Sequence, residues 1–478
     1  MAEGRFLYSF ERDLRLEDHA GLHAAASRGA VVPLLVVDPA RASRLARSPR
    51  RASYFCAAVK ALDRDLRDRG SRLIVRRGPA GEVLKAVAAE SGATGAAWSI
   101  GYGANAAATS ERVQSELEEA GYEAVTVHDA PAVPPDETAE AHSGAGDGYR
   151  AFAPYFEVWR ELPVVSHEHP LLLRFAGDDL ASEALPSPGE FAAGSASVKA
   201  GAAAAREAFD RFLRDDAAHY AEAALLPAED GTSRMSAHLS FGTISSRSMV
   251  AAIRERMRDA SRPAHERASL RSFLRALARR DFLLQLAWFH PRTFDEPLQE
   301  KMREFSFAQS HPALEAWRKG ATGFPLVDAG IRQLRDTGWM HPHVRAIAAS
   351  FLCFDLGVDW RIGRDEWDAL LVEDDDALAT GNWQWIAGVG ADMAQYPRIY
   401  NPERQRRRID ADGRYVRRWI PELERVPVAY WNDRASRSRQ LALELSVPGA
   451  YPQAVIDHGE AARAFLARYR AFITKGSL

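Results

Sequence analysis

The first 130 residues alternate short apolar runs with amphipathic stretches, and this alternation restricts the fold more than any other feature of the chain. Short apolar runs bounded by turn residues predict strands, and apolar residues that recur at three and four positions predict helices. We expect helices over 54–69 and 106–120, and strands over 6–9, 31–37, 72–75, 96–99 and 124–127. This order predicts an α/β N-terminal domain with a doubly wound parallel sheet.

The composition changes twice after this region. Residues 131–201 are rich in Pro, Gly, Ser, Ala and Glu, which is typical of a connecting segment, although the aromatic stretch 149–162 is expected to be packed. From residue 202 onward the chain is rich in Ala, Leu and Arg with helical periodicity. We therefore expect an α/β domain over 1–130, an interdomain linker over 131–201 and an all-α C-terminal domain over 202–478.

Charge and cysteine content exclude several classes of protein. The formal net charge is −3, so a nucleic-acid surface would have to be a local basic patch. Cys56 and Cys353 are the only cysteines and lie far apart, which argues against a disulfide scaffold, a zinc site or an iron–sulfur cluster, and no metal site is expected. The sequence reaches charged residues within its first five positions and contains no apolar run of about 18 residues, so we expect a protein that is neither secreted nor membrane-spanning. A cytoplasmic location is expected.

One short segment has the chemistry of a phosphate site. Residues 231–236, GTSRMS, stand just before an expected helix and combine hydroxyls, backbone amides and an arginine. Such groups at a helix start suit a phosphate or pyrophosphate. A structural helix cap with a surface arginine is the alternative. Two further segments, 317–345 and 373–402, gather Trp, His, Arg and acidic residues beside glycine and asparagine turns.

Five motifs in these regions resemble, in the same order, those of the photolyase/cryptochrome flavoproteins, and most closely those of class I cyclobutane pyrimidine dimer DNA photolyases. They are RDLRL at 12–16, TSRMSAHLSFG at 232–242, W-x-x-G-x-T-G-x-P-x-V-D at 317–328, TGWMH at 337–341 and WQW-x-x-x-x-G-x-D at 383–392. The resemblance extends over essentially the whole chain. It implies an antenna-type N-terminal domain and a helical domain that binds FAD for light-driven electron transfer.

The resemblance also implies which residues hold FAD. Around the phosphates and ribose it places Tyr220, Thr232, Ser233, Arg234, Met235 and Ser236. Along the isoalloxazine and adenine it places Arg280, Trp339, Arg345, Glu373 and Asp375, although a structural ion pair is an alternative role for Arg345. A second, antenna chromophore of unknown identity is implied for the N-terminal domain, where Glu11 and His19 depart from the family's signature.

Flavins of this family are photoreduced through a row of tryptophans, and the row is incomplete in this chain. Trp383 and Trp360 match its proximal and middle positions, whereas Phe307 stands at the distal one. A phenyl ring is much harder to oxidise than an indole, so another residue is expected to make the last step. Trp317 and Trp431 are the candidates.

The lesion pocket that the resemblance implies is altered. Ala276 and Arg279 replace a carboxylate and an indole, Pro342 and His343 replace an amide and a guanidinium, and Ala379 replaces an asparagine near flavin N5. Trp385 is retained where a base could stack, and Arg398 is a further implied DNA contact.

Two hypotheses follow. The first is a light-dependent DNA repair lyase that acts as a monomer through electron transfer from excited, reduced FAD. Its expected partner is double- or single-stranded DNA with a pyrimidine lesion. The second is a cryptochrome-like blue-light photoreceptor without repair activity. Basic rows are expected to attract phosphates or to form a solvated face. These rows are Arg267, Arg271, Arg275 and Arg279, and the arginines of 404–418.

Overall fold

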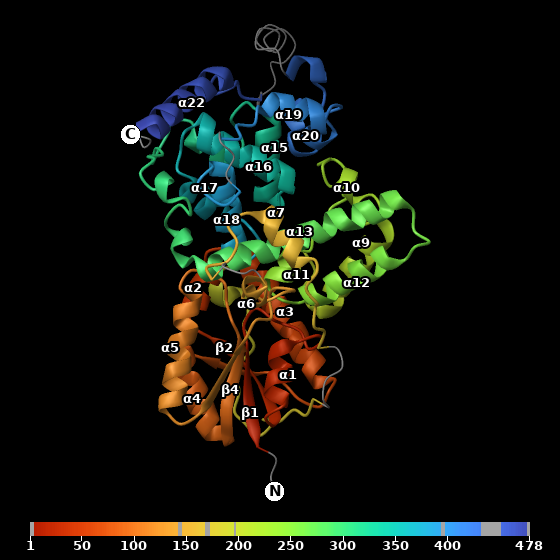
Figure 1. Cartoon of the computed structure of the whole chain (residues 1–478), viewed down its shortest axis with the longest axis vertical. Coiled ribbons are helices and arrows are strands. Elements are labelled where there is room, and N and C mark those ends of the chain that lie inside the picture. Colours follow the sequence, from red (N-terminus) through yellow and green to blue (C-terminus); the bar gives the residue numbers. More distant parts are fainter. Residues whose placement is uncertain are drawn as a thin grey trace. The chain divides into compact units, whose positions relative to one another are not determined.

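The computed structural model describes residues 4–141, 146–167, 173–195, 197–392, 397–431 and 451–475, and Figure 1 shows its elements. The chain divides into two compact units. The first comprises Met1–Ala221, Thr232–Phe294 and Val372–Leu378, and the second comprises Glu222–Gly231, Asp295–Leu371 and Ala379–Leu478. Each unit is therefore built from segments that are distant in sequence. The boundaries expected at residues 130 and 201 stay a prediction.

The sheet of the first unit confirms the predicted doubly wound α/β fold. Its five strands are all parallel and lie in the order β3-β2-β1-β4-β5. They are β1 (Arg5–Phe10), β2 (Ala30–Val37), β3 (Ile74–Arg77), β4 (Ala93–Ser99) and β5 (Glu123–Val127). The order reverses direction between β1 and β4, and the space beyond the carboxyl ends of these two strands is where such sheets bind ligands.

Helices cover both faces of this sheet (Figure 1). They are α1 (Ala20–Ala26), α2 (Pro39–Ala46), α3 (Pro49–Arg67), α4 (Ala80–Ser91) and α5 (Ala106–Glu119). Successive side chains of β1 enter two different cores: Phe6, Tyr8 and Phe10 pack in one, and Leu7 packs in the other. Burial on both faces explains why the strands read as continuous apolar runs and not as alternating ones.

The remainder of the first unit is helical. Its elements are α6 (Pro135–Glu140), α7 (Phe152–Trp159), α8 (Pro188–Phe191), α9 (Ala202–Asp215), α11 (Ser236–Ser240), α12 (Ser246–Arg258), α13 (Ala264–Phe289) and η1 (Pro291–Phe294). The short helix α10 (Tyr220–Ala223) begins in this unit. Helix α7 lies in the aromatic stretch that the sequence predicts to be packed, and its Phe152, Tyr155, Phe156 and Trp159 are buried.

The second unit is helical throughout its described part and has one large core. Its elements are η2 (Glu300–Met302), α14 (Leu314–Lys319), α15 (Pro325–Thr337), α16 (Pro342–Ser350), the π-helix η3 (Phe351–Asp355), α17 (Trp360–Asp368), α19 (Pro402–Ile409), α20 (Arg414–Trp419), η4 (Pro421–Leu423), η5 (Val428–Trp431) and α22 (His458–Lys475). Helix α18 (Asp376–Ala387) begins in the first unit and continues into the second. Among the described helices none has the length and apolar character needed to cross a membrane.

A buried carboxylate joins the sheet to the helices of the first unit. Asp129, just after β5, accepts a hydrogen bond of 2.7 Å from Arg15, which follows β1, and another of 2.7 Å from Arg247 of α12. All three side chains are at most 5% exposed. Burial alone would raise the pKa of Asp129, but the two guanidiniums reverse this effect and hold it well below its usual range.

Replacing Asp129 by Asn should destabilise the protein strongly, because Arg15 would lose its buried counter-charge and Arg247 would keep only Asp18, 3.5 Å away. We expect the free energy of unfolding to fall by about 3 to 5 kcal/mol. Asp179→Asn is the matched control, since Asp179 pairs with Arg5 on the surface and is 62% exposed, and it should change stability by less than about 1 kcal/mol. Denaturant titration of the two variants checks this prediction, and equal losses would contradict it.

Candidate cofactor and electron-transfer site

The segment with phosphate-site chemistry forms a turn that leads into α11. Arg234 has a φ of 51°, a left-handed conformation that is uncommon for a side-chain-bearing residue, and Met235 stands at the N-cap position. The hydroxyl oxygen of Thr232 is buried and has no hydrogen-bond partner among the described residues. A buried hydroxyl without a partner is unfavourable unless a ligand satisfies it. The turn therefore fits the phosphate group that the resemblance implies.

Two more predicted FAD residues, Glu373 and Tyr220, have contacts within the first unit. The Ser236 hydroxyl donates a 2.6 Å hydrogen bond to the Glu373 carboxylate. Tyr220, at the start of α10, packs edge-on against Phe212 and Phe273, with ring centroids 5.8 and 5.1 Å apart. Burial raises the pKa of Tyr220, so its hydroxyl stays protonated. The structure thus brings Glu373 beside Ser236, although 137 positions separate these residues in the sequence.

Arg280 and Asp375 also lie near each other. A guanidinium nitrogen of Arg280 is 3.9 Å from the Asp375 carboxylate, and Arg280 donates to the backbone oxygens of Ala130 (2.7 Å) and Leu239 (3.3 Å). Burial raises the pKa of Asp375, and Arg280 partly offsets this effect. These contacts fix the orientation of a guanidinium that the resemblance places along the ring systems of FAD.

The residue between Glu373 and Asp375 was missed by sequence reasoning. Asp374 is completely buried and lies within ion-pair distance of four arginines, which come from the N-terminal signature and from α2 and α3. They are Arg12 (3.6 Å), Arg41, Arg44 and Arg51 (3.8 Å). Burial opposes its ionisation, but these guanidiniums hold the pKa of Asp374 well below its usual range. The four consecutive acidic residues at 373–376 were the sequence signal that could have pointed to Asp374.

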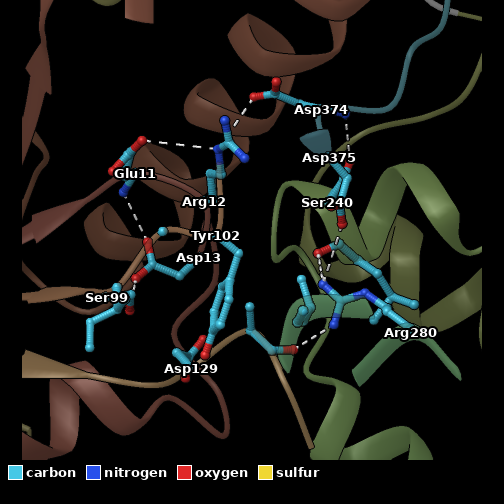
Figure 2. A pocket seen from close by; sticks show the side chains of 15 residues that line it. Glu11, Arg12, Asp13, Ser99, Tyr102, Asp129, Ser240, Arg280, Asp374 and Asp375 are labelled. Carbon is cyan, nitrogen blue, oxygen red and sulfur yellow. Dashed lines mark hydrogen bonds and ion pairs between the residues drawn. The ribbon is translucent and has the colours of Figure 1, made fainter. Parts of the chain in front are cut away.

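A polar pocket lies at the carboxyl ends of β1 and β4, where the order of the strands reverses (Figure 2). Glu11 and Arg12 reach it from the loop after β1, and Tyr102 reaches it from the loop after β4. Arg280 and the acids of 374–375 also line the pocket, as Figure 2 shows. The departure of Glu11 from the family's signature thus places a carboxylate in this pocket.

Three potential metal ligands cluster near this pocket. Ligand atoms of Asp13, His19 and Asp129 all lie within 4.8 Å of one another. Each is already engaged: Asp13 accepts hydrogen bonds from Tyr8 and from Ser99 (2.5 Å), and His19 Nδ1 accepts one from the backbone of Leu22 (3.2 Å). Asp129 is held by its two arginines. These contacts account for the cluster without an ion, and His19 caps α1 as an asparagine would.

In the second unit, the start of α16 carries several predicted site residues. Trp339 lies half-buried just before this helix, and Pro342 is exposed at its first turn. The backbone of His343 donates to His341 Nδ1 (3.3 Å), and the Arg345 guanidinium donates to the backbone oxygen of Met340 (2.8 Å). Burial, followed by the charge of Arg408, lowers the pKa of His343, so this side chain is neutral at pH 7.

Helices α17 and α18 carry the predicted tryptophans. Trp360 and Trp383 are buried, whereas Trp385 and Ala379 are half-buried. The exposed Arg398 lies with its guanidinium carbon 4.8 Å from the Trp385 ring centroid. The structure thus pairs two residues that the resemblance assigns to DNA. Trp367 of α17 contacts Trp383 and was missed, although its spacing of seven from Trp360 puts both on one helix face.

The remaining predicted pocket residues lie on α13 in the first unit. Ala276 is exposed, and Arg279 is half-buried with its guanidinium 4.3 Å from the Phe152 ring centroid. Arg275, one turn earlier, lies 4.5 Å from the ring of Phe156. Two of the four arginines in this row therefore stack on aromatic rings of α7, which is neither of the two roles expected from the sequence.

A histidine within the cofactor segment should make stability depend on pH. Burial lowers the pKa of His238 to about 4, and its Nδ1 is 2.7 Å from the Tyr54 hydroxyl. The unfolded chain therefore binds more protons than the folded one between about pH 4 and pH 6.5, and stability falls as the pH falls through this window. The loss should reach about 3 kcal/mol.

His238→Asn should remove this dependence, so the stability of the native protein relative to the variant should rise between pH 4 and pH 6.5. Denaturant titrations at several pH values measure it. His265→Asn, at an exposed position, is the control. A parallel pH dependence in the native protein and the His238 variant would refute the assignment.

Comparisons with known proteins identify the family. The model described as "DNA photolyase" matches residues 6–171, and the one described as "FAD binding domain of DNA photolyase" matches 273–471. The chain is 35% identical to a deoxyribodipyrimidine photo-lyase of Halobacterium salinarum, covering 95% of this chain and 96% of that one. It is 36% identical to a protein of the same name from Streptomyces griseus, covering 87% and 89%.

Solved structures agree with this result. A bacterial class III photolyase from Agrobacterium tumefaciens has a TM-score of 0.88 at 28% identity, covering 99% of this chain and 98% of that one. An archaeal photolyase from Sulfolobus tokodaii, described with two FAD molecules, has a TM-score of 0.83 at 27% identity, covering 98% and 100%. With the fold, the cofactor turn and these relatives in agreement, the chain belongs to the photolyase/cryptochrome family.

Proposed function

We propose that this protein repairs pyrimidine lesions in DNA with blue light, as a lyase that uses FAD. The observation that carries the proposal is the pair of Trp385 and Arg398 in the second unit, where a guanidinium lies over a half-buried indole. An aromatic surface with an adjacent cation suits an unstacked base and its phosphate. The relatives named deoxyribodipyrimidine photo-lyase support the same activity.

The cofactor half of the proposal rests on the turn at 232–236. We assign Tyr220, Thr232, Ser233, Arg234, Met235 and Ser236 to the phosphates and ribose of FAD, with the buried Thr232 hydroxyl as the clearest donor. To the ring systems we assign Arg280, Trp339, Arg345, Glu373 and Asp375. When bound and reduced, FAD supplies the electron that splits the lesion. The protein orients this group through Ser236, whose hydroxyl is itself fixed by Glu373.

Contact with the DNA backbone is assigned to the second unit. Arg404, Arg407 and Arg408 are exposed on α19 or at its end, whereas Arg406 is buried and donates to the backbone of Asp410 (3.0 Å). Three exposed guanidiniums on one short helix suit phosphate contact and predict salt-dependent binding. We assign Ala276, Arg279, Pro342, His343 and Ala379 to the surroundings of the lesion and the flavin, where they provide fewer hydrogen bonds than the residues they replace.

These replacements favour a second candidate, a blue-light photoreceptor without repair activity. Arg279 is occupied by its contact with Phe152, and the exposed Ala276 offers no polar group to a base. A loss of one donor or acceptor in a buried site costs about 1 to 3 kcal/mol of binding free energy. The protein would then bind dimers weakly, and its flavin photochemistry would have no substrate.

Other assignments complete the proposal. We propose that the protein acts as a monomer on double- or single-stranded DNA in the cytoplasm, and that residues 1–130, 131–201 and 202–478 serve as antenna-type domain, linker and FAD-binding domain. We also propose that the first unit holds a second, antenna chromophore of unknown identity. Absorption of cofactors released from the purified protein would identify both chromophores.

The repair assay is direct. The purified protein, with its flavin reduced by dithionite, is mixed with oligonucleotides that contain one cyclobutane dimer, in single- and double-stranded form, and loss of the dimer is followed under blue light and in darkness. We expect light-dependent loss of the dimer in at least one form. Absence of loss in both forms, with FAD bound and reduced, would refute the repair function and leave the photoreceptor.

Arg398 offers a test of DNA contact that does not depend on repair. Arg398→Ala should weaken binding to all oligonucleotides alike and reduce the slope of log affinity against log salt by about 1, because one phosphate contact is lost. Fluorescence anisotropy at several salt concentrations measures both quantities. Arg303→Ala is the control, since Arg303 pairs with Glu296 elsewhere in the second unit. An unchanged affinity and slope for Arg398→Ala would remove this residue from the DNA surface.

The assignment of the lesion pocket makes its own prediction. Ala276→Glu combined with Arg279→Trp should restore the hydrogen bond and the stacking surface, and tighten dimer binding about tenfold or more relative to undamaged DNA. Anisotropy with damaged and undamaged oligonucleotides measures this ratio. A ratio that stays the same in the double variant would show that these positions do not face the lesion.

A further inference from the structure

A buried carboxylate lies beside Arg280 in the first unit. Asp281 is 2% exposed, and its Oδ2 accepts three hydrogen bonds from outside α13. The donors are the backbone of Ala132 (2.9 Å), the backbone of Val133 (3.2 Å) and the indole of Trp159 (3.0 Å). The other oxygen, Oδ1, is buried and has no hydrogen-bond partner among the residues that the structure describes. The two oxygens of this carboxylate therefore differ, because Oδ2 has three donors and Oδ1 has none.

The oxygen without a donor lies near the Arg280 guanidinium. Nη1 of Arg280 is 3.9 Å from Oδ1 of Asp281, and Nη2 is 3.9 Å from Oδ2 of Asp375. Neither distance is a hydrogen bond, because the guanidinium donates instead to the backbone oxygens of Ala130 (2.7 Å) and Leu239 (3.3 Å). Two buried acids thus share one buried cation. Their charges determine how much of its positive field acts on a neighbouring ligand.

The other titratable groups around Asp281 keep their charge near neutral pH. Tyr102, from the loop after β4, and Tyr155 of α7 stay protonated, because burial raises the pKa of each well above its usual range. His128, whose Nδ1 is 2.5 Å from the Tyr102 hydroxyl, stays neutral at pH 7, because burial lowers its pKa. Asp129 is charged but has two arginines of its own.

Asp281 itself is able to change its charge in this range. Burial raises its pKa to about 6, and the neighbouring guanidinium and the three hydrogen bonds offset only part of this effect. A proton that binds Oδ1 leaves the three donors on Oδ2 in place. The carboxylate can therefore lose its charge without the loss of a hydrogen bond.

We propose that Asp281 is a positioning residue through which proton uptake strengthens the positive field of Arg280 along the ring systems of FAD. The inference rests on the proposed contact of Arg280 with FAD, and not on repair. The proton comes from solvent and binds Oδ1, and no electron moves in this step. With Asp281 neutral, Arg280 has one acidic neighbour instead of two. Its charge then favours reduced FAD, which carries more negative charge, over oxidised FAD.

Asp281→Asn tests this coupling, because the amide keeps an oxygen for the three donors but cannot ionise. The full-length FAD-bound protein is equilibrated with a redox dye of known potential, in darkness and without DNA, and absorbance gives the ratio of reduced to oxidised FAD. At about pH 7.5 the ratio should be at least about tenfold higher in the variant, because only the native site carries the additional negative charge. At about pH 5 the two ratios should agree within about twofold.

Glu266→Gln is the matched control. Glu266 also belongs to α13 and pairs with Arg262 at 3.2 Å, but it lies several turns earlier, roughly 22 Å from Asp281 at 1.5 Å per residue. Its substitution should leave the ratio unchanged at both pH values, which separates a local effect from a change in net charge. A difference between the native protein and the Asp281 variant that is absent, reversed or independent of pH would overturn the proposal.

A second measurement detects the proton without reduction of the flavin. Infrared difference spectra of the native protein between about pH 5 and about pH 7.5 should contain the carbonyl band of a buried, protonated carboxylic acid, and Asp281→Asn should lack it. A band that persists in the variant, or no band in the native protein, would contradict the proton site. Purified protein without FAD would refute the proposed function, whereas bound FAD whose reduction ignores Asp281 would refute this inference alone.

Discussion

The fold of the first unit depends on one buried charge. Asp129, just after β5, pairs with Arg15 from the loop after β1 and with Arg247 of helix α12. A buried carboxylate is stable only when cations offset its lost hydration. Asp374 is stabilised in the same way, because four arginines surround its buried carboxylate. Both acids adjoin the polar pocket at the strand ends, so the architecture of the sheet and that of the cofactor segment are fixed by paired charges.

Much of the fold follows from the sequence because it depends on local periodicity. The apolar runs predicted all five strands, but the strand predicted at 72–75 lies at Ile74–Arg77. The backbone N–H of Leu73 donates to the Asp63 carboxylate instead of pairing in the sheet, and no local pattern reveals such a contact. The division of the chain into two units was also hidden, because it depends on contacts between segments hundreds of residues apart.

The sequence motifs predicted many residues of the candidate site, but not the contacts between them. Ser236 and Glu373 were both expected around FAD, but their hydrogen bond was not, since nothing in either motif refers to the other. Asp374 and Trp367 were missed for the same reason: their importance lies in the arginines and indoles that surround them. The spacing of the arginines in α13 predicted that they share one helix face. Their stacking on Phe152 and Phe156 could not be predicted, because it depends on where α7 packs.

The central claim is that light absorbed by reduced FAD drives repair, and the action spectrum of dimer splitting tests it most directly. With the flavin fully reduced and the lesion in excess, the account predicts that the yield per incident photon follows the absorption of reduced FAD, with an added band if an antenna chromophore is bound. Splitting that does not follow the absorption of either chromophore, or no splitting at any wavelength, would contradict the account.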